Sequence, residues 1–174
     1  MQYGCIHLVE QGPMGGPDYR WGALSQLRAS YDCDSRALVL GDMHLKTEGI
    51  LESSLYVDDV ARSAQFYETI FGFRVISDFG GRGCAMQAGT HQVLLLFTKN
   101  GSRAMQTPHH GDGELHVAFA ILAEELAAWE GWLAKNGIAV EEKRTWDLGG
   151  QSLYFRDPDR HLIEIATPGV WSIY

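Results

Sequence analysis

The stretch LYVDDVARSAQFYETIFGFRV, residues 55–75, decides the fold of this chain. Its first residues complete the apolar run ILESSLYV, which predicts a strand. Asp59 then stands where a carboxylate caps the first turn of a helix, and Gly72 ends that helix with a residue suited to the left-handed conformation. Apolar side chains recur between them at helical spacing, at Val60, Ala64, Tyr67 and Phe71. The stretch therefore predicts a strand, a helix and the start of a second strand.

The same order of elements occurs twice along the chain. Three predicted strands follow the first helix: FRVIS, GCAMQ and HQVLLLFT. The second half starts with a predicted strand, ELHVAFAIL, and a helix with apolar residues at Leu122, Leu126, Trp129 and Leu133 that ends at Asn136-Gly137. Its last three predicted strands are IAVEEK, QSLYFR and HLIEIAT. The sequence thus predicts an α+β fold of two tandem β-α-β-β-β modules.

Alignment of the two halves supports an internal repeat. Glu52 aligns with His116, and Leu95 aligns with Glu164. The matched features also include Gly72 with Gly137 and the D-x-G-G sequences at 78–81 and 147–150. The two halves therefore carry different residues at positions that the repeat makes equivalent.

Composition excludes several classes of function. The chain has 174 residues, 45% of them hydrophobic and 21% charged, which suits one ordinary domain or two small fused modules. A formal net charge of -8 argues against nucleic acid as a partner, because phosphate binding needs clustered Lys and Arg. The sequence has neither an apolar run long enough to span a membrane nor a secretory leader pattern. Three scattered cysteines, Cys5, Cys33 and Cys84, indicate reduced thiols in a cytoplasmic protein.

The first residues differ from the rest of the chain. Residues 1–47 hold no helical or strand period for long, and GPMGGPDYRWG within them is rich in Gly and Pro. We expect an irregular N-terminal extension, with Trp21 and Leu24 as anchors if it packs, followed by modules at 48–110 and 111–174 that form one domain. Met43 is the expected natural start of the domain.

Glu164 lies in the apolar run HLIEIAT, and a buried carboxylate needs a partner. The residues alone leave two interpretations of Glu164, a metal ligand or a salt bridge to a buried arginine such as Arg156. His116 is equally open between a hydrogen-bonded core histidine and a ligand. Of the other histidines, His91 and His161 are interpreted as structural or exposed, and His109 and His110 as solvent-facing residues that flank the cleft.

Residues 55–75, together with YFRDPDRHLIEI at 154–165, resemble the vicinal oxygen chelate superfamily. That superfamily includes glyoxalase I, bleomycin-resistance proteins, fosfomycin-modifying enzymes and extradiol dioxygenases. The resemblance covers roughly residues 48–170 and implies modules that curl into a mixed sheet around a cleft. It also implies metal ligands on the first and last strands of each module.

Transferred by position, the resemblance assigns Glu52, His116 and Glu164 as metal ligands, whereas Leu95 cannot coordinate a metal. Glu52 stands where the family most often has histidine, so it is either a carboxylate ligand or a replacement that marks a lost site. One imidazole and two carboxylates suit a divalent ion such as Mn²⁺, Zn²⁺, Fe²⁺, Ni²⁺ or Mg²⁺. Three protein ligands leave open positions for a substrate with adjacent oxygens, and the metal would act as a Lewis acid. The sequence does not identify a general base.

These residues favour a metal-dependent isomerase, epimerase or lyase that acts on a small oxygenated metabolite or xenobiotic. One alternative is a metal-free binding protein that sequesters small molecules, as bleomycin-resistance proteins do. The other is an extradiol-type dioxygenase, which the single histidine disfavours. The cationic residues with which fosfomycin-modifying enzymes bind a phosphonate are not evident in this sequence. The resemblance further implies a homodimer, in which Glu52 and the pair His116 and Glu164 meet either within one chain or across the dimer.

Overall fold

The structure is a computed structural model that describes residues 45–174, of which 46–174 form one compact unit. The expectations placed on Cys5, Trp21, Leu24, Cys33 and Met43 lie outside the described residues.

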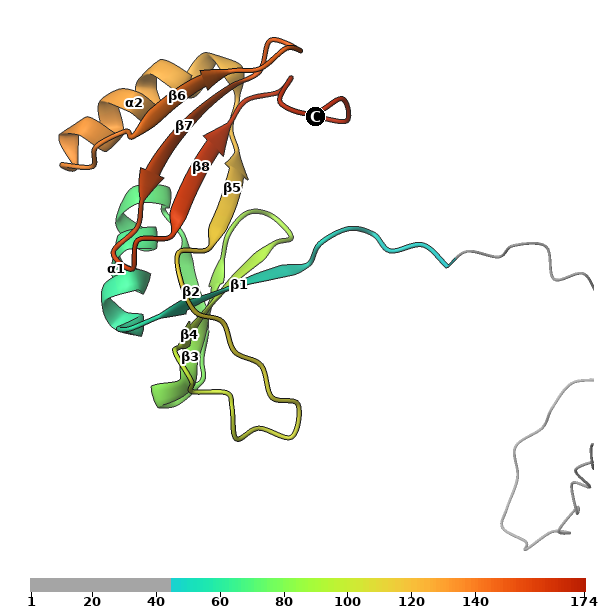
Figure 1. Ribbon diagram of the computed structural model, residues 1–174, viewed down its shortest axis with the longest axis vertical. Coiled ribbons are helices and arrows are strands. Elements are labelled where there is room, and N and C mark those ends of the chain that lie inside the picture. Colours follow the sequence, from blue (N-terminus) through green and yellow to red (C-terminus); the bar gives the residue numbers. More distant parts are fainter. Residues whose placement is uncertain (1–44) are drawn as a thin grey trace, which may run out of the picture. The chain divides into compact units, whose positions relative to one another are not determined.

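Each module follows the predicted order of one strand, one helix and three strands (Figure 1). The first module contains β1 (Glu52–Val57), α1 (Val60–Phe71), β2 (Arg74–Asp78), a 3₁₀ turn (Gly80–Arg82), β3 (Gly83–Gln87) and β4 (Val93–Thr98). The second contains β5 (His116–Ala120), a 3₁₀ turn (Ala123–Glu125), α2 (Leu126–Lys135), β6 (Glu142–Thr145), β7 (Gln151–Arg156) and β8 (Leu162–Ala166).

The strands form two four-stranded mixed sheets, in the orders β1-β4-β3-β2 and β5-β8-β7-β6. In each sheet the first and last strands of the module are parallel neighbours. The registers also correspond, because Glu52 pairs with Val93 as His116 pairs with Leu162. The predicted α+β fold of tandem β-α-β-β-β modules is therefore confirmed, as two open sheets rather than a closed barrel.

Helix α1 begins and ends where the sequence predicts. The Asp59 carboxylate accepts a hydrogen bond from the Arg62 N–H at 3.0 Å, which satisfies one free donor of the first turn. Gly72 has a φ of 69°, and its N–H bonds to carbonyl oxygens of the last turn. The predicted strand 138–143 was misplaced, because Ile138 and Val140 pack against the core and β6 starts only at Glu142.

The two modules share one hydrophobic core. It contains Leu55 and Tyr67 of the first module together with Leu133, Phe155 and Ile163 of the second. Helix α1 lies beside the turn between β7 and β8 (Figure 1). The core fixes the orientation of the second sheet against α1.

The turn between β7 and β8 binds the start of α1 through two carboxylates. Asp159 accepts hydrogen bonds from the N–H of Asp58 at 2.7 Å and the hydroxyl of Ser63 at 2.6 Å. Asp157 accepts a hydrogen bond from the buried Tyr67 hydroxyl at 2.9 Å. These contacts hold the two modules together with polar groups at the edge of the core.

His161 is a structural residue at the same junction, and it is fully buried. The Leu115 N–H donates to Nδ1 at 3.0 Å, so the ring proton lies on Nε2 and is donated to the Tyr56 carbonyl at 3.0 Å. His161 thereby connects β1 of the first module with the segment that leads into β5.

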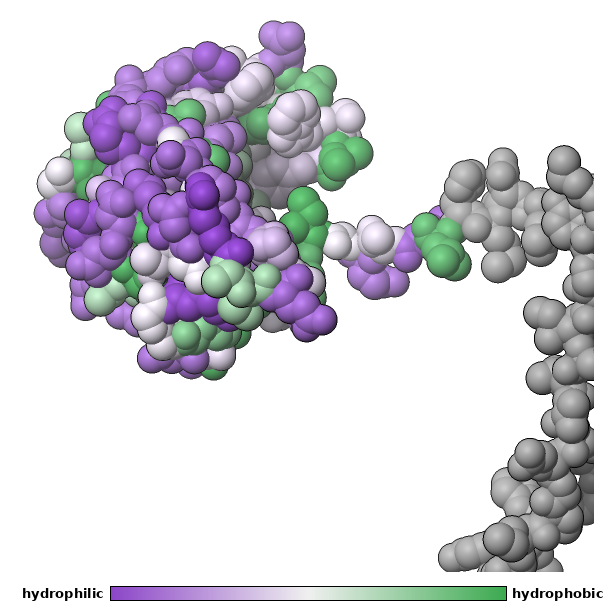
Figure 2. Space-filling model, turned by 60° about the horizontal axis from the view of Figure 1, so that its bottom comes forward, coloured by the Kyte–Doolittle hydropathy of each residue, from purple (hydrophilic) through white to green (hydrophobic). Residues whose placement is uncertain are grey.

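The surface of the described unit is largely hydrophilic on the face shown in Figure 2, where hydrophobic residues occupy small separate areas. Among residues 45–174, none of the helices has the length and apolar character that a membrane span requires.

Candidate functional site

Four side chains share the face of the second sheet that points away from the core. Alternation along the strands places four side chains on this face: His116 of β5, Glu164 of β8, and Ser152 and Tyr154 of β7. Val117, Ile163 and Phe155 point to the opposite face and belong to the core. The alternation of the strands therefore places these polar residues on one face of the sheet and the apolar core on the other.

His116 and Glu164 lie in contact on this face. The His116 Nε2 atom is 3.3 Å from Glu164 Oε2, and the other ring nitrogen, Nδ1, is 3.0 Å from the Leu162 carbonyl oxygen. A carbonyl only accepts hydrogen bonds, so Nδ1 carries a proton. In the neutral imidazole, the lone pair of Nε2 then faces the carboxylate.

Glu164 is held from its other side by Ser152. The side chain of Glu164 is only 7% exposed, and its Oε1 accepts a hydrogen bond from the Ser152 hydroxyl. The Ser152 oxygen in turn accepts the indole N–H of Trp146 at 2.9 Å. This chain of hydrogen bonds fixes the carboxylate and leaves Oε2 directed at His116.

Arg156 is not the partner of Glu164. Its guanidinium pairs with Glu114 at 2.9 Å and with Glu141 at 3.0 Å. The salt-bridge interpretation of Glu164 with Arg156 is therefore wrong, and the carboxylate faces His116 and Ser152 instead.

Tyr154 borders both the His116–Glu164 pair and a cavity. Burial raises the pKa of Tyr154, and its hydrogen bond to Glu164 raises it further, so the phenol stays protonated at neutral pH. A cavity of about 390 Å³ opens beside the ring; its lining is Glu141, Glu142, Arg144, Tyr154, Arg156 and Leu162. Arg144 pairs with Glu142 at 2.8 Å, so both arginines of this cavity are neutralised by glutamates.

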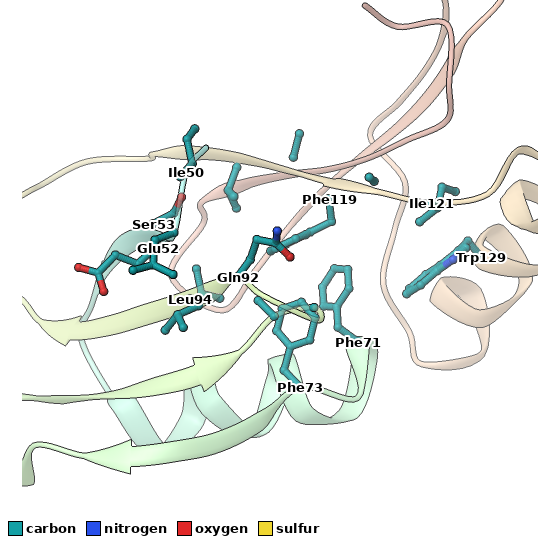
Figure 3. A pocket seen from close by; sticks show the side chains of 17 residues that line it. Ile50, Glu52, Ser53, Phe71, Phe73, Gln92, Leu94, Phe119, Ile121 and Trp129 are labelled. Atoms are coloured by element: carbon teal, nitrogen blue, oxygen red, sulfur yellow. The ribbon is translucent and has the colours of Figure 1, made fainter. Parts of the chain in front are cut away.

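Glu52 lies at a different place, on the edge strand β1. It is exposed and borders an apolar groove of about 620 Å³ between β1, β5 and α2. In Figure 3 the rings of Phe71, Phe73 and Phe119 gather at this groove, and the Glu52 carboxylate points away from them. Within the described part of one chain, no three His, Cys, Asp or Glu residues are grouped so that they hold a metal ion. A single chain therefore brings His116 and Glu164 together, and Glu52 does not join them.

The remaining histidines divide between the surface and the first sheet. His91 and His110 are exposed, whereas His109 is half-buried, with its ring centroid 4.5 Å from that of Phe97. Ser152 and Tyr154 were not among the predicted site residues. Strand alternation in QSLYFR was the available signal, because it places Ser152 and Tyr154 on one face.

Comparisons with known proteins identify the family of this chain. The Glyoxalase/Bleomycin resistance protein/Dioxygenase superfamily profile matches residues 49–165. The metallothiol transferase FosB of Staphylococcus epidermidis is 32% identical over 113 residues, which cover 64% of this chain and 75% of that protein. FosB of Bacillus licheniformis is 31% identical over 127 residues, covering 72% and 79%.

A similar solved structure is the lactoylglutathione lyase of Agrobacterium tumefaciens. It has a TM-score of 0.68 and 29% sequence identity, and the match covers 72% of this chain and 98% of that one. The resemblance noted in the sequence is confirmed, because the matched residues include both modules and the strands that carry Glu52, His116 and Glu164. The chain belongs to the Glyoxalase/Bleomycin resistance protein/Dioxygenase superfamily.

Proposed function

We propose that this protein is a metal-dependent isomerase, epimerase or lyase for a small oxygenated molecule, with His116, Glu164 and the Glu52 of a second copy as metal ligands. The observation that carries the proposal is the 3.3 Å approach of His116 Nε2 to Glu164 Oε2 while Nδ1 is bonded to a carbonyl. The family includes metal-dependent enzymes, and its FosB members are named metallothiol transferases.

The approach of these two atoms needs a positive charge between them. Neutral imidazole with its proton on Nδ1 offers a lone pair at Nε2, and a carboxylate oxygen offers another. Two acceptors at 3.3 Å repel each other unless a proton or a metal ion lies between them. A carbonyl that receives the second ring N–H is also the usual support of a metal-binding histidine.

The donor set fits a divalent metal. Imidazole nitrogen and carboxylate oxygen are ligands for Mn²⁺, Zn²⁺, Fe²⁺, Ni²⁺ and Mg²⁺ in differing degrees. When bound, the metal would supply a Lewis acid that stabilises negative charge on a substrate oxygen. Ser152 keeps the Glu164 carboxylate in position, and the protonated Tyr154 hydroxyl offers a donor beside it.

A second copy is proposed because Glu52 and His116 each lie on an edge strand, β1 and β5 respectively. Strands β1 and β5 are both edge strands, so one side of each backbone has no partner strand among the described residues. The apolar groove between them leaves Ile50 and Leu51 exposed. A twofold-related copy that covers the groove would hide this surface and bring its own β1 toward the first chain.

Thiol transfer to a small molecule is the second candidate, and two observations favour it. The FosB relatives are named metallothiol transferases. The cavity beside Tyr154 is lined by Arg144 and Arg156, two cations that the sequence did not indicate as ligands for a phosphonate. Their glutamate partners make the cavity suited to a molecule with both positive and negative groups. Thiol consumption by the metal-loaded protein would separate this activity from isomerase or lyase activity.

The test is metal analysis of protein purified without chelator, for wild type, His116→Ala and Glu52→Ala. We expect bound metal in wild type and a large loss in both variants. When the two variants are mixed and allowed to exchange subunits, half of the dimers combine one chain of each. Each such dimer then has one intact site, so about a quarter of the wild-type metal returns.

The matched control is Glu48→Ala, an exposed carboxylate ahead of β1 that should leave metal content unchanged. Substoichiometric metal in wild type and His116→Ala alike would reject the metal-dependent enzyme and favour a metal-free binding protein. Recovery of no metal on mixing would reject a site shared between two copies.

A further inference from the structure

A cluster of aromatic, histidine and arginine side chains covers the face of the first sheet that points away from the shared core, outside the site described above. Alternation along β1 and β4 places Tyr56 and Phe97 on this face, as register partners. The connection between β4 and β5, residues 99–115, returns from the far end of the first sheet toward β5 (Figure 1). His109 and His110 of this connection contact Tyr56, with ring centroids 5.9 and 6.4 Å away.

The contacts of this cluster form a closed ring. Arg82 stands 5.1 Å over the Phe97 ring, which packs against His109. The Tyr56 hydroxyl is 2.8 Å from His109 Nδ1, and Arg103 donates to His110 Nε2 at 2.9 Å. Arg82 also donates to Ser102, a buried residue next to Arg103 in the chain, at 3.4 Å.

The connection is fitted closely to Tyr56. A Cβ added at Gly111 would stand 2.4 Å from the Cδ2 atom of that ring, so only glycine allows the chain to pass there. The segment that carries both histidines is thus packed against Tyr56 at Gly111.

The two arginines of the cluster differ from those of the second sheet. Arg144 and Arg156 are paired with glutamates. Arg82 and Arg103 have only neutral partners, Ser102 and His110, among residues 45–174. In a chain of net charge -8 with 22 acidic residues, two guanidinium groups that pair with no carboxylate within residues 45–174 retain their capacity for an external anion.

The tautomer of His110 adds a further donor. A guanidinium group cannot accept a hydrogen bond, so His110 Nε2 is the acceptor and the ring proton lies on Nδ1. The cluster therefore offers guanidinium and imidazole N–H donors beside half-buried aromatic rings of Tyr56 and Phe79.

We propose that Arg82, Arg103 and His110, backed by Tyr56 and Phe79, form a binding site for a small aryl oxyanion. The guanidinium groups hold the carboxylate or phosphate oxygens, and the rings contact the apolar part of the ligand. Glu52 and Tyr56 share a face of β1 and lie about 13 Å apart along the strand, so this site is separate from the proposed metal ligands. The inference goes beyond the proposed function, because it requires no metal.

The test is calorimetric titration of the metal-free full-length protein with benzoate, phenyl phosphate and neutral benzyl alcohol. We expect one of the two anions to bind and benzyl alcohol to bind at least about ten-fold more weakly, because it lacks the charge-assisted hydrogen bonds. Preference for benzoate assigns a carboxylate ligand, and preference for phenyl phosphate assigns a phosphate ligand.

The variants Arg82→Gln and Arg103→Gln should each weaken anion binding by about ten-fold. The control is Arg74→Gln, because Arg74 also has a neutral partner, Gln87, but lies on β2 outside the cluster. It should leave affinity unchanged. Arg82→Lys keeps the charge without the forked geometry and should bind more tightly than Arg82→Gln.

Equal affinity of wild type, Arg82→Gln and Arg103→Gln would overturn the proposal, as would an equal loss in Arg74→Gln or the absence of binding by wild type. Thermal melting of each variant separates a folding defect from a binding defect. His116→Ala should bind the anion as wild type does, so the anion-binding result does not depend on whether the metal proposal holds.

Discussion

Leu95 and Glu164 occupy the same position in the two sheets. Leu95 is the register partner of Ser54, as Glu164 is the register partner of Ala118, with β1 parallel to β4 and β5 parallel to β8. The repeat therefore continues at the level of strand register, and the chemistry of the two modules differs at this pair. The second sheet carries a carboxylate beside His116, and the first carries an apolar side chain that packs with Ala85 and Phe97.

A carboxylate at position 95 should restore the missing donor of the first module. We expect Leu95→Glu to lower the free energy of unfolding by about 2–4 kcal/mol without metal, because Leu95 is buried. Added Mn²⁺ or Zn²⁺ should then raise the melting temperature of this variant more than that of wild type, because metal binds the folded state. The isosteric control is Leu95→Gln, and an equal metal response in both variants would contradict the prediction.

Ser152→Ala should loosen the carboxylate of the pair. The change removes the hydroxyl that donates to Glu164 and accepts the Trp146 indole N–H, both in a buried setting. We expect a loss of about 1–3 kcal/mol in unfolding free energy and a weakening of metal affinity by about 10–100-fold. Denaturant titration and metal titration measure the two effects. Ser77→Ala, at an exposed position of β2, should change neither.

Leu51→Asp should prevent association if a second copy covers the apolar groove. Leu51 is 67% exposed in the described unit, so a carboxylate there costs the isolated chain little. We expect sedimentation to give the monomer mass for this variant and metal content to fall with it. Ile76→Asp is the matched control, because Ile76 is 56% exposed but lies on β2, the opposite edge of the first sheet. A dimer that survives Leu51→Asp and dissociates with Ile76→Asp would place the interface at β2.

Asp159→Asn should change the response of the protein to acid. Burial would raise the pKa of Asp159, but the Asp58 N–H, the Ser63 hydroxyl and the Arg62 guanidinium together lower it below its ordinary value of 3.8. A carboxylate with a lowered pKa in the folded state stabilises the protein above its unfolded pKa. That contribution is lost as the pH falls through the lower, folded value.

Wild type should therefore lose stability in acid more steeply than Asp159→Asn, which should already be less stable at pH 7. Denaturant unfolding from pH 7 down to about pH 2, a span that extends below the ordinary carboxyl pKa, measures this difference. Asp58→Asn serves as the control, because among residues 45–174 the Asp58 side chain forms only an exposed ion pair with Lys99, and the substitution keeps the backbone N–H that donates to Asp159. Parallel stability curves for wild type and Asp159→Asn would show that the Asp159 carboxylate makes no pH-dependent contribution to the free energy of unfolding.

The local elements were predictable because local signals specify them. Asp59 and Gly72 mark the ends of α1 through capping geometry that depends only on neighbouring residues. The prediction failed at Ile138 and Val140, whose alternating pattern matches a strand. Their side chains pack against the core from an extended connection, and alternation alone does not distinguish that from a paired strand.

By itself, the sequence determined the tandem modules, the family resemblance and the difference between Leu95 and Glu164, because strand and helix periods and the internal repeat are properties of the chain. Only the tertiary structure decided the partners of Glu164. It selected His116 and Ser152 over Arg156, and it left Glu52 at a separate edge of the molecule. These contacts join strands that are far apart along the chain, and their geometry follows from register and packing rather than from local pattern.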